Sequence, residues 1–157
     1  MNRRPVLPML AILMAVGLAG CASNQNLPPT NGTTWQPPHN ATPEDAATAD
    51  RLWQVFERYE GTPYRYGGAS ANGFDEALGR QLPRTTSQML ASGDVVGRDQ
   101  LRAGDLVFFR IKGKDQHAGI YMGGDSFIHS STSIGVTRSS LNGYYWRDRF
   151  SQARRFD

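Results

Sequence analysis

The sequence contains very little cysteine and no apolar run long enough to cross a membrane. Its 157 residues include one cysteine, Cys21, so a single chain can form neither a disulfide nor a zinc site built from cysteines. Any thiol chemistry in the chain must therefore use Cys21. The apolar run from Val6 to Leu18 is too short to span a bilayer, which takes about 20 residues.

A strong excess of one charge sign is also absent. The formal net charge is +3 at pH 7, and two of these charges, Arg3 and Arg4, lie in the segment that we expect to be removed as a leader. This balance disfavours nucleic acid as a partner. The 39% of apolar residues, the 17 glycines and the 9 prolines fit one loop-rich globular domain with additional segments and exclude a coiled coil or collagen.

The first 21 residues have the pattern of an export signal. Arg3 and Arg4 precede the apolar run, and Leu18-Ala19-Gly20 places small residues directly before Cys21. This arrangement is typical of a secretory signal peptide, and its end resembles a bacterial lipobox, in which the cysteine becomes the acylated first residue of the mature chain. We therefore predict a signal peptide at residues 1–20 and lipidation of Cys21. The alternative is an ordinary secretory signal in which the cysteine is incidental.

The predicted anchor also implies a location. The acyl chains of a lipidated Cys21 would hold the protein at a membrane. Ala22 follows the cysteine, which by resemblance to lipoproteins of Gram-negative bacteria implies the periplasmic face of the outer membrane. Residues 21–41 are rich in Asn, Thr, Pro and Gln and should form a flexible tether, because they offer little apolar surface to offset the entropy of ordering. The globular domain is predicted at residues 42–157.

Helix signals come early in that domain. Thr42 has the position of an N-cap and Pro43 that of the first helical residue. Apolar side chains then follow on one helical face, at Leu52, Val55, Phe56 and Tyr59. The helix should end at Gly61-Thr62-Pro63, and a second, short helix is expected at Thr85–Ala91.

Strand signals fill the rest of the domain. Alternating apolar residues bounded by polar or glycine-rich turns predict five strands, at Asp105–Arg110, Gln116–Met122, Ser126–Ser130, Gly135–Ser140 and Ser151–Phe156. Early helices and late strands predict an α+β domain in which N-terminal helices pack on a five-stranded antiparallel sheet.

Five sequence blocks follow one another between Ala46 and Asp157. They are Gly61-Thr62-Pro63-Tyr64-Arg65-Tyr66-Gly67-Gly68 with Asn72-Gly73-Phe74-Asp75, then Leu82–Gln88, Leu101–Phe109, His117–Gly123 and Phe127–Ser130. In this order and spacing they resemble the NlpC-type cell-wall cysteine peptidases. The resemblance implies a papain-like fold and hydrolysis of amide bonds in the stem peptides of peptidoglycan by a cysteine, a histidine base and a third polar residue. It implies peptidoglycan as the partner, with no cofactor and no metal.

The resemblance assigns roles to three residues. His117 corresponds to the base, His129 to the residue that orients it, and Tyr64 to a tyrosine that lines the site and can donate to a developing oxyanion.

The strand pattern is compatible with a histidine pair. A three-residue loop at Gly123-Gly124-Asp125 would pair Met122 with Ser126 and Gly119 with His129. His117 and His129 would then be diagonal neighbours on one sheet face. A two-residue loop would place them on opposite faces, so this interpretation depends on the register.

The sequence departs from the family directly after Asp75. The family continues with Cys-Ser-Gly and an apolar helix, whereas Glu76-Ala77-Leu78-Gly79-Arg80 resembles the far end of that helix. About ten residues, nearly three helical turns, are missing, and the nucleophile is among them. Glu76 takes the nucleophile's position, where we expect its carboxylate to form an ion pair with His117. Cys21 cannot substitute, because acylation consumes it.

The loss bears on stability as well as chemistry. The missing helix would bury about three apolar side chains, at about 1.5–3 kcal/mol each, which is comparable to the whole stability of a small domain. The shortened domain should therefore be marginal, rearranged or stabilised by a partner.

Other chemistries find little support in the sequence. Four serines are available as nucleophiles, but no Gly-x-Ser-x-Gly turn presents one; they are Ser70, Ser87, Ser130 and Ser131. A metal site from His117, His129 and Asp115 has a conceivable composition but no further well-spaced ligand.

We therefore predict an NlpC-type lipoprotein without catalytic activity that binds peptidoglycan or a partner protein. The alternative is an active lineage of cell-wall peptide hydrolases in which this chain is a deletion variant. A structural lipoprotein that never contacts the cell wall is a third hypothesis.

Overall fold

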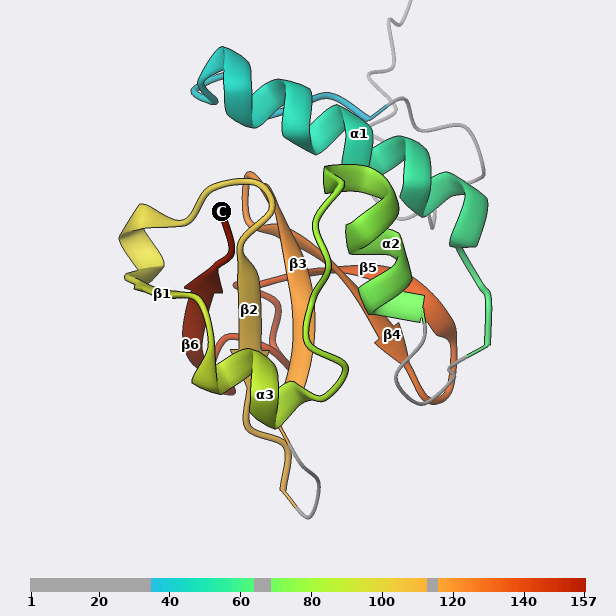
Figure 1. Cartoon of the computed structure of the whole chain (residues 1–157), viewed down its shortest axis with the longest axis vertical. Coiled ribbons are helices and arrows are strands. Elements are labelled where there is room, and N and C mark those ends of the chain that lie inside the picture. Colours follow the sequence, from blue (N-terminus) through green and yellow to red (C-terminus); the bar gives the residue numbers. More distant parts are fainter. Residues whose placement is uncertain (1–34, 64–68, 113–115) are drawn as a thin grey trace, which may run out of the picture. The chain divides into compact units, whose positions relative to one another are not determined.

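Helices precede the main strands in the computed structural model, which describes residues 35–63, 69–112 and 116–157 (Figure 1). The three α-helices of this part are α1 (Pro43–Tyr59), α2 (Ala69–Leu78) and α3 (Thr86–Ala91). A short strand β1 (Asp94–Val96) and a 3₁₀ turn (Arg98–Gln100) lead into the other strands, which are β2 (Leu106–Phe109), β3 (His117–Gly123), β4 (Ser126–Ser131), β5 (Gly135–Ser140) and β6 (Phe150–Arg155). The α+β class is confirmed.

Helix α1 forms where the sequence predicts it. The Thr42 Oγ1 accepts a hydrogen bond from the Asp45 N–H at 3.1 Å, and Pro43 occupies the first turn. Leu52 and Phe56 are buried on the face that contacts the sheet. Helix α3 likewise begins after the predicted cap, because the Thr85 side chain accepts from the Gln88 N–H.

The sheet has six strands in the described part of the chain, in the order β1-β6-β2-β3-β4-β5, and every neighbouring pair is antiparallel. The five expected strands are present, each within one residue of its predicted bounds. The strand that the sequence did not predict, β1, pairs with β6. It spans three residues and exposes 71% of Val95, so it is too short and too exposed to leave an alternating pattern.

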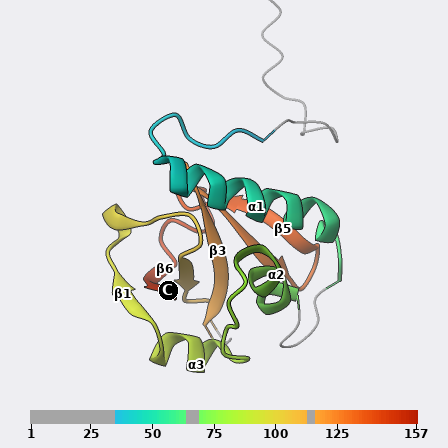
Figure 2. The ribbon, with the colours of Figure 1, turned by 45° about the horizontal axis from the view of Figure 1, so that its top comes forward.

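The two faces of the sheet are covered differently. All three helices lie on one face, and their buried side chains share a core with Leu106, Phe108 and Ile120; Figure 2 shows α1 crossing the end of the strands beside α2. On the opposite face, Val107, Phe109, Phe127 and other residues are covered by Trp146, which precedes β6, by Phe150, the first residue of β6, and by Leu101.

Helix α2 occupies the region where the sequence suggested a missing helix. It includes the Asn72-Gly73-Phe74-Asp75 motif, which the family resemblance places before the nucleophile helix. Phe74 is fully buried and Ala77 is 6% exposed, and both belong to the core shared with α1. Phe74 and Ala77 are three residues apart and therefore share one helical face. The three outcomes considered for the shortened domain stay predictions.

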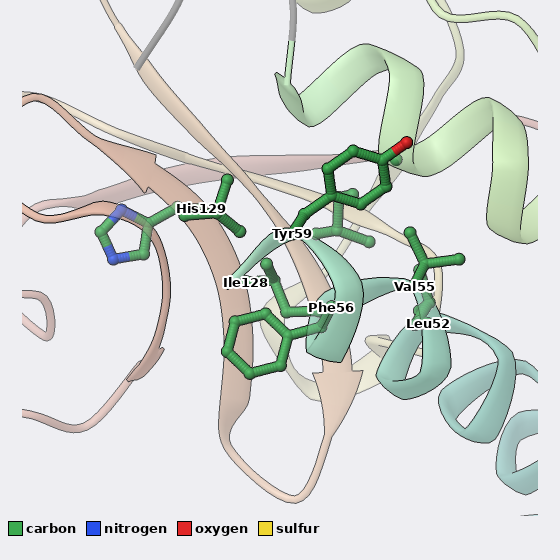
Figure 3. Close-up of a pocket in the computed structure, with 9 residues that line it drawn as sticks. Leu52, Val55, Phe56, Tyr59, Ile128 and His129 are labelled. Carbon is green, nitrogen blue, oxygen red and sulfur yellow. The ribbon is translucent and has the colours of Figure 1, made fainter. Parts of the chain in front are cut away.

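A small gap remains beside α2. A pocket of about 30 Å³ lies between α1, α2 and strands β3 to β5, lined mainly by apolar side chains and by Gly73 (Figure 3).

Part of the segment predicted as a tether is packed against the domain. The Trp35 ring stacks on Trp53 of α1, with ring centroids 5.5 Å apart, and Pro38 lies against the turn at Gly123 and Gly124. The rest of that segment, like the predicted leader and Cys21, lies outside the described residues. Among the helices in the described part of the chain, none is both long and apolar enough to cross a membrane.

Candidate functional site

Two histidines meet on the sheet face opposite the helices. His117 begins β3 and His129 lies in β4, and Gly119 pairs with His129 as predicted. The His117 Nε2 and the His129 Nδ1 are 3.0 Å apart. The predicted histidine pair is therefore formed, although its catalytic role stays a prediction.

The hairpin that creates this register is built differently from the expectation. Gly123 pairs with Ser126 and Tyr121 with Phe127, which leaves Met122 as an extra residue in β3. The predicted pairing of Met122 with Ser126 is therefore wrong. The turn has two residues with positive φ, Gly124 (53°) and Asp125 (75°). By itself such a turn would put His117 and His129 on opposite faces of the sheet. The extra residue Met122 shifts the register by one position and returns the two histidines to the same face.

Glycine is required opposite His129. A Cβ atom at Gly119 would lie 2.6 Å from a ring carbon of Phe127 and 2.9 Å from the Ile128 carbonyl oxygen. A side chain at this position would push the two strands apart, and the distance between the histidines depends on their close approach.

His129 is buried and neutral. It is 4% exposed, and its burial, with a smaller contribution from the neighbouring His117, lowers the pKa of its imidazole to about 3. Its Nε2 lies 3.0 Å from the Ser139 Oγ. A neutral His129 can donate to Ser139 and accept from His117, or accept from Ser139 and donate to His117. Both arrangements orient the His117 ring.

The sequence interpretation missed Ser139. Ser139 lies in the predicted strand Gly135–Ser140, but its place beside His129 follows from the observed pairing of Thr137 with His129. A residue two positions further along β5 lies on the same face at a diagonal.

Trp146 was also missed. Its ring stacks on His117, with centroids 5.4 Å apart and an interplanar angle of 24°, and it meets His129 edge-on at 4.8 Å. It lies between β5 and β6, where no element was predicted, so only the folded chain brings it to the histidines.

Glu76 does not occupy the position expected for it. Its two carboxylate oxygens bind the Arg58 guanidinium and the Tyr59 hydroxyl, both on α1. The expected ion pair with His117 is replaced by this contact, because α2 and the histidine pair are on opposite faces of the sheet. Figure 3 shows the His129 ring turned away from Phe56 and Tyr59, which line the pocket below α1.

The other candidate residues do not assemble a second centre. Tyr64 and Asp115 lie outside the described residues, as does Cys21, and nothing is described of the Ser70 side chain. Ser87 and Ser131 bond to neighbouring hydroxyls, while the buried Ser130 hydroxyl has no hydrogen-bond partner. Within residues 35–63, 69–112 and 116–157, no three histidine, cysteine or acidic side chains group as metal ligands would.

The hydrogen-bonded histidine pair has the chemistry of a general base. An oriented imidazole pair can bind and transfer a proton. Attack on an amide needs in addition a thiol or hydroxyl beside the base. Among the described residues, the Ser139 hydroxyl contacts His129.

Comparison with known proteins places these features in a family. Residues 61–155 match the NlpC/P60 family. The chain is 39% identical to the "Probable endopeptidase NlpC" of Escherichia coli K12 over 93% of this chain and 97% of the relative. It is 40% identical to the murein DD-endopeptidase/LD-carboxypeptidase MepS of the same strain over 67% of this chain and 61% of the relative.

Solved structures agree with this match. An NlpC/P60 protein from Bacillus cereus ATCC 10987 aligns with a TM-score of 0.58 and 26% identity, over 69% of this chain and 40% of that one. RipD from Mycobacterium tuberculosis, described as a non-catalytic NlpC/p60 domain protein adapted to binding peptidoglycan, aligns with a TM-score of 0.53 and 20% identity over 70% of this chain and 98% of RipD, a likeness of fold. The residues matched and the shared fold together make this chain a member of the NlpC/P60 family.

Proposed function

We propose that this protein is an outer-membrane lipoprotein whose NlpC/P60 domain binds the stem peptides of peptidoglycan without cleaving them. One observation carries the proposal: the family region, residues 61–155, keeps the histidine pair but contains no cysteine. Family chemistry depends on a thiolate beside the base, so a domain with this composition retains a binding face and lacks the attacking atom.

The lengths of the aligned segments support loss of the nucleophile helix. The alignment with MepS extends over 115 positions but uses 67% of this 157-residue chain, which is about 105 residues. About ten positions of the relative therefore have no counterpart here. The gap after Asp75 that the sequence motifs indicate has the same length.

The packing around α2 supports a stably folded domain that lacks activity. Phe74 fills the core and Glu76 is held by Arg58 and Tyr59, so the segment that follows Asp75 makes specific contacts. RipD, which is described as non-catalytic and peptidoglycan-binding, is a precedent for this use of the fold. Lipidation at Cys21 and the outer-membrane location rest on the sequence of the leader.

Two measurements on the purified full-length protein test the binding claim. We expect it to sediment with isolated peptidoglycan sacculi and to release no soluble muropeptides above a buffer control. Muropeptide release by the original protein that is lost in the His117→Ala variant would contradict the proposal. It would require a mechanism that uses the histidine pair without a thiol. Absence of binding to sacculi would also overturn it.

The anchor is tested separately by Cys21→Ser. We expect this variant to leave the membrane fraction and accumulate as an uncleaved or soluble form. A variant that stays in the membrane at mature length would contradict lipidation while leaving the binding claim intact.

A further inference from the structure

A row of aromatic side chains begins at the histidine pair and continues to the surface. Trp146 stacks on His117, and Tyr145 meets Trp146 edge-on at 4.8 Å. Tyr145 is 45% exposed, and the adjacent Tyr144 is 87% exposed. We name Tyr144, Tyr145 and Trp146, together with Arg147 and Arg149, the aromatic row.

The row is rigid although it lies in a connection between strands. The Trp146 N–H donates to the Gly143 carbonyl, and the Arg149 N–H donates to the Trp146 carbonyl, both at 3.0 Å. The Trp146 ring is fixed from below by Phe109 and Phe127, with centroids 4.7 and 5.2 Å away. Two exposed tyrosines on a connection held in this way lose little entropy when a ligand binds.

The row is also cationic. The Arg149 guanidinium lies 4.0 Å from the centre of the Tyr145 ring, and the Arg147 guanidinium lies 5.8 Å from that of Tyr144. Asp148, 3.6 Å from Arg147, is the one acidic side chain among residues 141–149. Exposed Tyr, Trp and Arg are the residue types that carry most binding energy at interfaces, and the guanidinium fork matches a carboxylate.

We propose that the aromatic row binds a peptide bearing free carboxylates, and that in this protein the ligand is the stem peptide of peptidoglycan as it extends from the histidine pair. The inference rests on the proposed function and deepens it. Tyr144 and Tyr145 contact the peptide with their ring faces, and Arg147 pairs with a carboxylate. Trp146 is a positioning residue that joins the row to His117.

Titration of the purified full-length protein with soluble muropeptides, read by fluorescence anisotropy of a labelled ligand, tests the row. We expect Tyr144→Ser and Tyr145→Ser each to weaken binding about three- to tenfold. Val95→Ala, an exposed apolar side chain on β1 outside the row, is the matched control and should bind as the original chain does. Unchanged melting temperatures confirm that the variants are folded.

A second titration tests the carboxylate. Amidation of the free carboxylates of the ligand should weaken binding to the original chain about threefold, and should have little further effect on Arg147→Gln. The exposed Arg84→Gln, outside the row, should keep the full sensitivity to amidation.

The outcomes separate the two proposals. Binding of muropeptides by the original chain with no loss in the row variants would overturn the aromatic row and leave the proposed function standing. Equally tight binding of poly-glutamate would also overturn it, because the surface would then recognise charge alone. No binding by the original chain to muropeptides or sacculi would overturn both.

Discussion

The histidine region and the helical region of this protein match the sequence pattern of the family to different extents. In the strands β3 to β5, His117, His129 and Ser139 form a continuous hydrogen-bonded chain, and the sequence blocks that resemble the family are intact. In the helical region the sequence motifs predict a loss of about ten residues, and α2 includes the motif that the family resemblance places before the nucleophile. The comparison teaches that strand pairing by itself can hold the histidine pair, whereas the helix layer depends on side-chain packing.

The reason lies in how each region is held. The histidines are fixed by backbone pairing on both sides of β4, which does not depend on the helix layer. Phe74, in contrast, is held by packing alone, and packing can be satisfied by a different segment of similar volume.

The largest expected effect is a gain of activity. Inserting a family-like helix that begins Cys-Ser-Gly between Asp75 and Glu76 should produce amide hydrolysis that thiol alkylation blocks, because the helix N-terminus lowers the pKa of a cysteine thiol there. The measurement is muropeptide release from sacculi with and without iodoacetamide.

The control for this insertion carries Ser in place of that Cys. It should match the Cys version in stability and show no hydrolysis, which separates packing from chemistry. A folded but inactive Cys version would mean that the inserted thiol does not reach His117 from the helix face of the sheet, or that the histidine region has also diverged. Either result would contradict this prediction.

Truncation of Phe74 tests whether α2 stabilises the core. Phe74→Ala should lower the free energy of unfolding by about 3–5 kcal/mol, the usual loss for a fully buried phenylalanine. Denaturant unfolding followed by circular dichroism measures it, with the exposed Asn72→Ala in the same helix as the matched control. A loss no larger than that of the control would show that α2 does not stabilise the core.

Acid should destabilise the histidine region. The pKa of His129 is about 3 in the folded chain and about 6.5 when unfolded, so between these values the unfolded chain binds more protons. The stability contributed by the neutral His129 is complete above pH 6.5 and is lost as the pH falls towards 3. At pH 4.5 the free energy of unfolding should be about 3 kcal/mol lower than at pH 7.

The pH dependence is measured by unfolding the original chain and His129→Asn at several pH values. The variant should have lower stability at pH 7 and a flatter profile between pH 7 and 4.5. Parallel profiles for the two proteins would contradict the buried, neutral state of His129.

The smallest expected effect is a gain in stability. Gly73 lies within α2, and a Cβ atom there would meet only Val55 Cγ1, at the ordinary contact distance of 3.7 Å. Gly73→Ala should therefore raise the free energy of unfolding by about 0.5–1 kcal/mol, through helix propensity and partial filling of the pocket under α1. Thermal unfolding tests this, and a destabilised variant would show that α2 tolerates no added volume.

Local signals in the sequence determined most of the elements. The Thr42 cap predicted the first residue of α1 correctly, and the stop signal at Gly61-Thr62-Pro63 begins two residues beyond its last residue. Strand alternation placed five strands, because period-two patterns report directly on a half-buried sheet. The family blocks identified His117 and His129 as a pair, and the register at Gly119 agreed.

Other features required the tertiary structure. The bulge at Met122 could not be predicted from the number of residues in the hairpin loop. It nevertheless determines that the two histidines lie on the same face of the sheet. The pairing of Glu76 with α1 and the stacking of Trp146 on His117 join segments distant in sequence. The sequence by itself determined which residues can form helices, strands and a proton-transferring pair, because those properties depend on neighbours along the chain. Only the tertiary structure decided what each side chain contacts, because packing and burial depend on segments that the chain brings together when it folds.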